Sequence, residues 1–184
     1  MKALKALSSE QATVETAAIF DKIKQHIGRV PNLYAAIGNS SNLLEGFLHF
    51  GESLKKGVFS SKEQEAIALA VSQVNKCAYC LSAHTAMAKM HGFSEEETMQ
   101  LRDGTIEDNK LNALTNLASE ITLNRGDAPT ESIERFFAVG YTATAFAELI
   151  GLIALRIITN YIYHNGDFAI DFPKAKFIED LVAA

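Results

Sequence analysis

The sequence has little of several features that mark particular classes of protein. Its 184 residues contain no Trp, three Pro and two Cys, and the formal net charge of -5 comes without any run of Lys or Arg. Nucleic acid binding requires a basic patch or stripe, so nucleic acid is not expected as a partner. The N-terminal segment MKALKALSSEQATVET lacks the uninterrupted apolar region of a signal peptide, which predicts a cytoplasmic, reducing location.

Long apolar runs are also scarce. The longest, residues 143–163, is interrupted by Glu148 and Arg156, and we expect it to form a buried core helix rather than a membrane span. Polar residues inside such a helix are usually paired internally or buried in a subunit interface, and the same expectation applies to Asn160 and His164. No membrane is therefore expected as a partner.

Patterns typical of β-strands are missing as well. No segment alternates convincingly between apolar and polar residues, and no Asn-Gly or Asp-Gly pair joins two β-branched runs. Apolar residues instead recur with helical spacing, which predicts an all-α fold. A chain of 184 residues with 48% hydrophobic content can bury its own core, so we expect one domain over residues 1–184. The predicted helices span residues 13–27, 42–56, 62–74, 77–91, about 108–123, 130–139 and 142–163, with a new turn after 30–32 and a short helix after Ser94.

Both cysteines fall in one short segment, NKCAYCLSAH, at residues 75–84. A two-residue break precedes Cys77, which places this residue in the first turn of a new helix. At about 100° per residue, Cys80 and His84 project to the same side as Cys77, while Tyr79 points nearly opposite. The unpaired N–H groups of a helix N-terminus stabilise a thiolate, and His84 supplies a general base or a cationic partner. Such a thiol pair can reduce an electrophilic oxygen or sulfur and then close to a disulfide.

Two other interpretations of this segment remain open. Both cysteines could be inert core residues, a common fate for Cys. The C-x2-C-x3-H spacing also supplies three ligands suited to zinc, with His91 or Glu65 as a fourth, although three ligands on one helix face converge poorly on a tetrahedral ion. A thioredoxin-like site is not expected, because its C-x2-C lies between a strand and a helix.

The segment EAIALAVSQVNKCAYCLSAHT, residues 65–85, resembles the core of the alkylhydroperoxidase AhpD and carboxymuconolactone decarboxylase superfamily. Peroxidase members carry Glu, eleven residues, Cys, two residues, Cys, three residues and His, and Glu65, Cys77, Cys80 and His84 fit this spacing without a gap. The best-studied peroxidase has a His between the cysteines, where this chain has Tyr79. The resemblance is most specific over residues 60–94 and extends more loosely to 30–47 and 138–164.

The resemblance implies an AhpD-like helical bundle with the CxxC at a helix N-terminus, assembled as a homo-oligomer such as a trimer or hexamer. It implies reduction of hydroperoxides, with Cys80 as the peroxide-reacting thiol, Cys77 as the resolving thiol, and Glu65 and His84 as a proton relay. Burial would raise the pKa of Glu65, which suits a proton carrier.

The partners implied by the resemblance are a hydroperoxide substrate and an external dithiol, thioredoxin-like or lipoyl electron donor. No cofactor and no metal are expected. The alternative functions are a carboxymuconolactone decarboxylase-like lyase, and a non-enzymatic helical oligomer that senses redox state or binds a metal.

Overall fold

The computed structural model describes residues 2–176 and residue 178, so both ends of the predicted 1–184 domain lie outside the described residues. Within this part the chain forms nine α-helices and no strand, apart from one isolated bridge between Leu4 and Gly166, which confirms the all-α prediction. The helices are α1 (Val14–Ile27), α2 (Asn32–Ile37), α3 (Ser41–Leu54), α4 (Ser61–Val74), α5 (Ala78–Met90), α6 (Glu95–Asp103), α7 (Asn109–Leu123), α8 (Thr130–Ala138) and α9 (Ala143–His164).

The helix ends follow local capping chemistry. Ser60 caps α4 and Ser94 caps α6, each in a capping box with the Glu three residues later. Gly28 ends α1 in the left-handed conformation with φ of 82°, which a residue without Cβ adopts at no steric cost. The cysteine helix begins one residue later than predicted, because Cys77 is its N-cap rather than part of its first turn.

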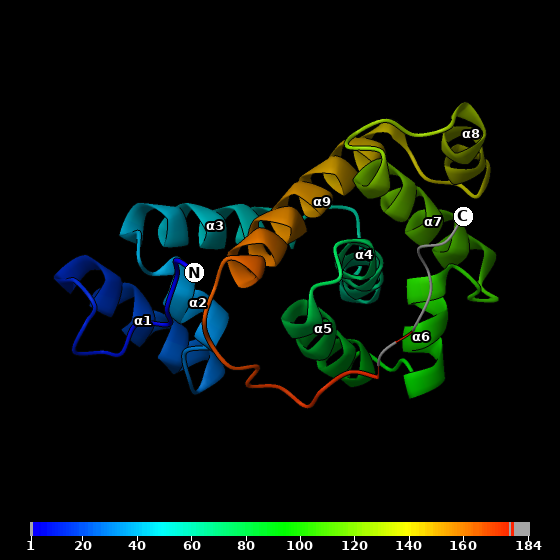
Figure 1. Ribbon diagram of the computed structural model, residues 1–184. Coiled ribbons are helices and arrows are strands. Elements are labelled where there is room, and N and C mark those ends of the chain that lie inside the picture. The colour runs from blue at the N-terminus through cyan, green and yellow to red at the C-terminus, as the bar shows by residue number, and fades with distance from the viewer. Residues whose placement is uncertain (1, 177, 179–184) are drawn as a thin grey trace.

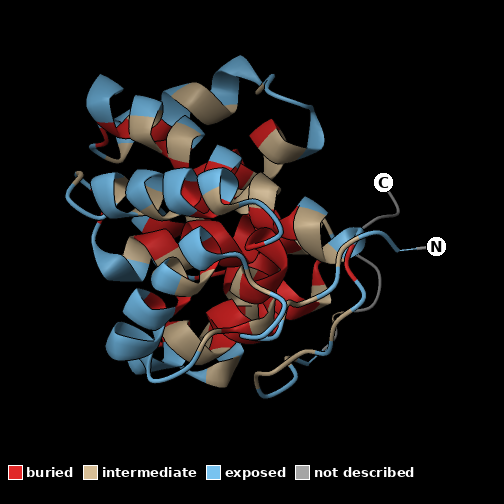
Figure 2. Ribbon diagram, turned by 90° about the vertical axis from the view of Figure 1, so that its left-hand side faces the viewer, coloured by how far each residue is buried: buried red, intermediate tan, exposed pale blue. Residues whose placement is uncertain are grey.

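Helix α4 is the centre of the molecule. Its residues Ala66 to Val71 have no exposed surface, as expected for a run that is apolar all round. Helices α5, α6, α7 and α9 pack around it, as Figure 1 shows, and the buried residues concentrate there in Figure 2. Helices α1, α2 and α3 lie together at one end, where a second group of buried side chains surrounds the two cysteines.

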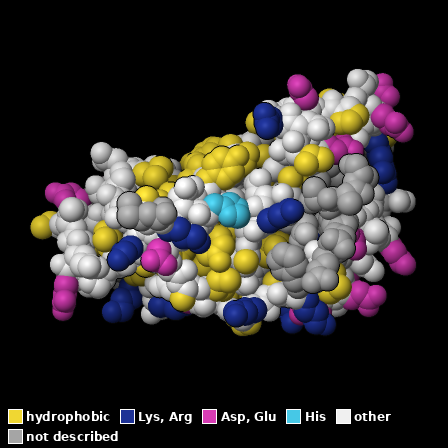
Figure 3. Space-filling view, viewed as in Figure 1, with side chains coloured by type: hydrophobic (Ala, Val, Ile, Leu, Met, Phe, Trp, Pro, Cys, Tyr) yellow, Lys and Arg dark blue, Asp and Glu magenta, His cyan; other side chains and the backbone are white. Residues whose placement is uncertain are grey.

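Helix α9 is long and apolar enough to cross a membrane by length and composition alone. One of its sides packs against α2, α3 and α4, with Leu149, Leu152 and Leu155 almost fully buried. The expectation of a buried core helix holds only for this side. The other side is exposed and carries Ala147, Ile150, Ala154 and Tyr161, and Figure 3 shows hydrophobic side chains gathered over this helix.

The polar residues of α9 are paired internally, as predicted. Glu148 accepts a hydrogen bond from the Val58 N–H, Arg156 donates to His84, Asn160 contacts Ser72 and Asn75, and His164 lies 2.7 Å from the Asn75 carbonyl oxygen. The contacts of Arg156, Asn160 and His164 hold α9 against α4, α5 and the turn between them, where the cysteines lie.

Candidate functional site

A tight reversal between α4 and α5 positions the cysteines. Lys76 lies in the left-handed region with φ of 51°, which turns the chain back after Asn75. Helix α9 holds this turn from outside. Asn75 donates a side-chain hydrogen bond of 2.8 Å to Asn160, and its carbonyl accepts one of 2.7 Å from the His164 ring. The connection is therefore fixed by side chains that follow it by more than eighty residues in the sequence.

Cys77 and Cys80 form a disulfide across the first turn of α5, with their Cα atoms 5.3 Å apart. The Cys80 N–H donates to Cys77 Sγ at 3.3 Å, so sulfur occupies the capping position that a Ser or Asp oxygen usually takes. Cys77 has no exposed surface and Cys80 is 2% exposed. The pair thus lies within one turn of the helix start, inside an apolar environment.

His84 follows Cys80 by one helical turn on α5, so the two side chains lie on the same face of that helix. Its Nδ1 is 2.7 Å from Glu65 Oε2 on α4, and its Nε2 is 3.2 Å from Nη1 of Arg156 on α9. A guanidinium can only donate, so Nε2 must accept this hydrogen bond. Neutral His84 therefore carries its proton on Nδ1 and donates it to Glu65.

The electrostatic surroundings keep His84 neutral and Glu65 ionised. Burial lowers the pKa of His84, and the charge of Arg156 lowers it further, while Glu65 raises it without cancelling the other two. Burial raises the pKa of Glu65. The interactions with His84 and the positive charge of Arg156 lower it by more than burial raises it. The pKa of Glu65 is therefore lowered, and the prediction that it is raised is wrong.

Arg156 is the member of this cluster that sequence reasoning missed. From the sequence we expected Arg156 to be a structural residue of the last long helix. Its one distinguishing feature there is that it is the single cation in the apolar run of residues 143–163. In the structure it is partly exposed, and its Nε is buried with no hydrogen-bond partner among the described residues. No carboxylate of the described residues lies within ion-pair distance of it.

Tyr79 points away from the cysteine and histidine side of α5, as predicted. It is 1% exposed, its hydroxyl donates a 2.5 Å hydrogen bond to Asp171, and it accepts a 3.3 Å hydrogen bond from the Leu33 N–H. Burial and the hydrogen bond to Asp171 raise its pKa. The ring also packs against Phe168 and Phe172. Tyr79 therefore anchors the segment after α9 and takes no part in the Glu65–His84–Arg156 cluster.

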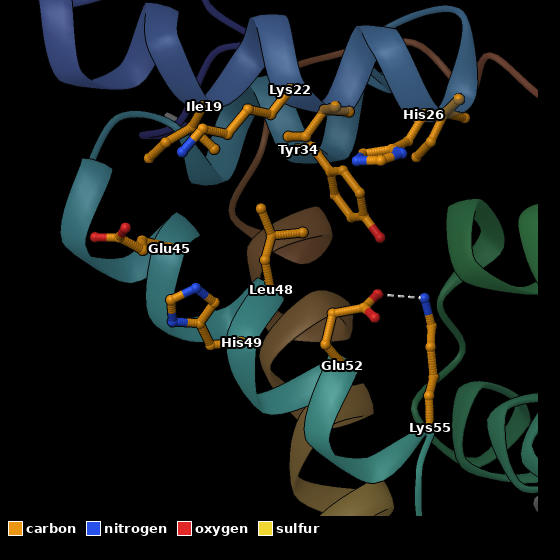
Figure 4. Close-up of a pocket in the computed structure, with 11 residues that line it drawn as sticks. Ile19, Lys22, His26, Tyr34, Glu45, Leu48, His49, Glu52 and Lys55 are labelled. Atoms are coloured by element: carbon orange, nitrogen blue, oxygen red, sulfur yellow. Dashed lines mark hydrogen bonds and ion pairs between the residues drawn. The ribbon is translucent and has the colours of Figure 1, made fainter.

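Two neighbouring hollows lie on the α1–α3 side of the cluster. A groove of about 560 Å³ runs between α1 and α3 (Figure 4). A smaller cavity of about 80 Å³ shares Tyr34, Leu48, Glu52 and Lys55 with it and reaches Arg156. The residues that the structure describes contain no group of three or more His, Cys, Asp or Glu side chains suited to a metal ion. The zinc interpretation therefore has no ligand set among them.

The sequence matches a known family over its central part. Residues 42–121 match the carboxymuconolactone decarboxylase family, and all four predicted site residues fall inside this range. This segment is similar to that family. The resemblance predicted from the cysteine motif is thereby confirmed. A comparison with curated proteins finds no significant match.

Several solved structures share the fold. A cysteine-to-alanine variant of the debrominase Bmp8, in complex with 2,3,4-tribromopyrrole, has a TM-score of 0.76 at 18% identity, over 93% of this chain and 92% of that chain. An uncharacterized peroxidase-related protein with an AhpD core, from Ralstonia eutropha JMP134, has a TM-score of 0.76 at 16% identity, over 89% and 90%. Another peroxidase-related protein, from Silicibacter sp. TM1040, has 0.71 at 23% identity, over 88% of each chain. The AhpD-like all-α fold is thus confirmed.

Proposed function

We propose that the protein is a thiol-dependent oxidoreductase that reduces hydroperoxides through Cys77 and Cys80. The observation that carries the proposal is the disulfide one helical turn from His84, whose ring is oriented by Glu65 and Arg156. A pair of thiols beside a neutral, oriented imidazole has the groups that peroxide reduction requires. The match to an enzyme family and the AhpD-like fold support an enzymatic role.

The proposed cycle consumes one hydroperoxide and two thiols. The Cys80 thiolate attacks the terminal oxygen of the hydroperoxide, the O–O bond breaks, and the alcohol leaves as an alkoxide that takes up one proton. This step forms a sulfenic acid on Cys80. The Cys77 thiol then attacks that sulfur, forms the disulfide and releases water. An external dithiol of the thioredoxin-like or lipoyl type reduces the disulfide by two electrons and becomes oxidised itself.

His84 carries the proton in this proposal. It removes the proton from the Cys80 thiol and returns it to the departing alkoxide. The ring nitrogen without a proton is Nε2, and its lone pair accepts the hydrogen bond from Arg156. Nε2 must therefore lose this hydrogen bond when it takes up a proton and can form it again when it releases the proton. Glu65 stays hydrogen-bonded to Nδ1 and stabilises the imidazolium that forms. The relay thus has a carboxylate on one side of the ring and a guanidinium on the other.

The decisive experiment is a thiol titration of the reduced protein before and after one equivalent of cumene hydroperoxide. We expect the loss of two thiols and, by mass spectrometry, an internal disulfide in the Cys77–Cys80 peptide. The Cys77→Ser variant should instead accumulate a sulfenic acid on Cys80 that dimedone captures. Full peroxide-dependent thiol oxidation in a Cys80→Ser variant would contradict the assignment of the reactive thiol.

The same assay separates the competing functions. A carboxymuconolactone decarboxylase-like lyase would keep its activity on a lactone in the Cys77→Ser/Cys80→Ser double variant. A redox sensor would form the disulfide but not turn over in the presence of a dithiol. Because a protein of this fold is a debrominase, tribromopyrrole serves as a second substrate with the same dithiol.

We also propose that the chain forms a homo-oligomer, such as a trimer or hexamer, through the exposed side of α9. No charged residue interrupts the exposed positions of that helix from Ala143 to Tyr161, where Ile150 is 41% and Tyr161 57% exposed. Light scattering coupled to gel filtration tests this. Ile150→Glu should dissociate the oligomer, whereas Leu123→Glu, at an exposed residue of α7, should not. A monomeric wild-type protein at micromolar concentration would contradict the proposal.

A further inference from the structure

The groove between α1 and α3 contains side chains that hydroperoxide reduction does not use. Ile19, Ile23 and Ile27 repeat at intervals of about one helical turn and form an apolar wall on α1, and Leu48 faces them from α3. The volume of about 560 Å³ falls in the range of small-molecule sites, roughly 300 to 1,000 Å³. The groove therefore has the size of a small-molecule site and one apolar wall. The rest of its lining is polar or charged and consists of Lys22, His26, Tyr34, Glu45, His49, Glu52 and Lys55.

The inner end of the groove has a different character. The neighbouring cavity measures about 80 Å³, so it is much smaller than the groove. Tyr34 stands at the junction, and Figure 4 shows its hydroxyl directed towards Glu52 and Lys55. Gln64 and Arg156 line the cavity beyond this point. The cavity therefore offers polar side chains to a small group.

Arg156 supplies a positive charge beside the smaller cavity. Glu65, the acid that attracts this charge, lies beyond ion-pair distance and contacts the other nitrogen of the His84 ring. The Nη1 of Arg156 donates to His84, and its Nε is buried without a partner. Its Nη2 has no hydrogen-bond partner among the described residues and is not among the buried unpaired atoms, and Arg156 is one of the residues that line the cavity. The acid among the residues that line the cavity, Glu52, is paired with Lys55 at 2.6 Å. A carboxylate oxygen can accept a charge-assisted hydrogen bond from the Nη2 of Arg156.

We propose that the groove and its inner cavity bind a monocarboxylic acid with an apolar chain. The carboxylate meets Arg156 in the cavity, and the chain lies between the α1 isoleucines and Leu48 in the groove. Lys22 reaches the groove from α1 and adds a second positive charge along the chain (Figure 4). The site does not rest on cysteine chemistry, because neither cysteine lines the groove or the cavity.

Isothermal titration calorimetry with octanoate, octan-1-ol and acetate tests the proposal on the full chain. We expect octanoate to bind at least about ten-fold more tightly than octan-1-ol, and acetate to bind more weakly than octanoate, because each lacks one of the two interactions. Arg156→Met should reduce octanoate affinity to that of octan-1-ol, and Arg156→Lys should retain part of the difference. Equal affinity for octanoate and octan-1-ol in the wild-type protein, or no binding of either, would overturn the proposal.

A second pair of variants tests the groove and keeps the proposal falsifiable if Arg156 variants do not fold. Leu48→Asp places a like charge in the groove and should abolish octanoate binding. Leu43→Asp changes an exposed residue of the same helix outside the groove and should leave binding unchanged. Equal effects of the two changes would overturn the proposed location. Repeating the titration in the Cys77→Ser/Cys80→Ser variant separates carboxylate binding from the peroxidase function, since we expect only the latter to be lost.

Discussion

Replacing Arg156 by Met is expected to raise the pKa of His84. In the structure the guanidinium Nη1 lies 3.2 Å from the ring Nε2, where a proton must be added to charge the ring. Two unit charges about 4 Å apart repel by about 4 kcal/mol at an effective dielectric constant of about 20. One pKa unit corresponds to about 1.36 kcal/mol. Water entering the vacated space offsets part of this repulsion, so we expect the pKa of His84 to rise by about one to three units.

The assay is a nitrogen NMR titration of the histidine rings in the oxidised protein, with the His84 signal assigned from a His84→Gln variant. Arg135→Met is the matched control, because Arg135 is exposed and makes no contribution to the pKa of His84. The control should leave the titration of His84 unchanged. If Arg156→Met leaves the pKa of His84 where it is in the wild-type protein, or lowers it, the electrostatic account of the cluster is refuted.

The same variant changes the dependence of stability on pH. The pKa of His84 in the folded protein lies below its ordinary value of 6.5, so the unfolded chain binds this proton first as the pH falls. The stability that His84 contributes is complete above about pH 6.5 and is lost as the pH falls towards the folded-state pKa. Arg156→Met brings the two pKa values closer together. Urea unfolding at about pH 7 and about pH 5 should therefore show a smaller loss of unfolding free energy in the variant than in the wild-type protein.

The remaining predictions concern groups with one clear partner each. Glu65→Leu should lower the free energy of unfolding by about 1 to 3 kcal/mol at pH 7, because the buried Nδ1–H of His84 loses its acceptor. Tyr79→Phe should increase hydrogen exchange of residues 166–172, measured by mass spectrometry, because the hydroxyl no longer binds Asp171. Gly57→Ala should lower the midpoint of urea unfolding, because a Cβ there would overlap the carboxylate of Glu148.

Each of these predictions has a matched control. Glu65→Gln keeps an acceptor for His84 and should cost less stability than the Leu variant. Tyr161→Phe removes the hydroxyl of an exposed tyrosine and should leave hydrogen exchange of residues 166–172 unchanged. Gly46→Ala adds a Cβ in open space inside α3 and should stabilise the protein by about 0.5 to 1 kcal/mol. A destabilising Gly46→Ala or a neutral Gly57→Ala would contradict the steric explanation.

The features that the sequence predicted correctly are those that local geometry determines. Helix periodicity and capping boxes such as Ser60 with Glu63 depend on residues three or four positions apart, so they can be recognised without the fold. The common face of Cys80 and His84 follows from the same spacing. Glu65 was found only through the family motif, because its contact with His84 depends on how α4 and α5 pack.

The features that could not be predicted join distant parts of the chain. Arg156 meets His84 across 72 residues and Asp171 meets Tyr79 across 92, and no local pattern encodes the packing that brings them together. The wrong prediction for the pKa of Glu65 has the same origin. Burial could be inferred from the apolar run around it, but the extent to which His84, and after it Arg156, would compensate for this burial could not.

These distant contacts change how the cysteine motif is to be understood. Tyr79 stands where the best-studied peroxidase has a His, but its hydroxyl is held by Asp171 and Leu33, so it cannot replace that imidazole in proton transfer. The second polar group at His84 comes from α9 instead, as Arg156. Because this contact occupies the lone pair that must accept a proton, the basicity of His84 depends on how closely α9 approaches α5. A ligand carboxylate on Arg156 would weaken its repulsion of the imidazolium, which would make occupancy of the α1–α3 groove a determinant of thiol reactivity at Cys80.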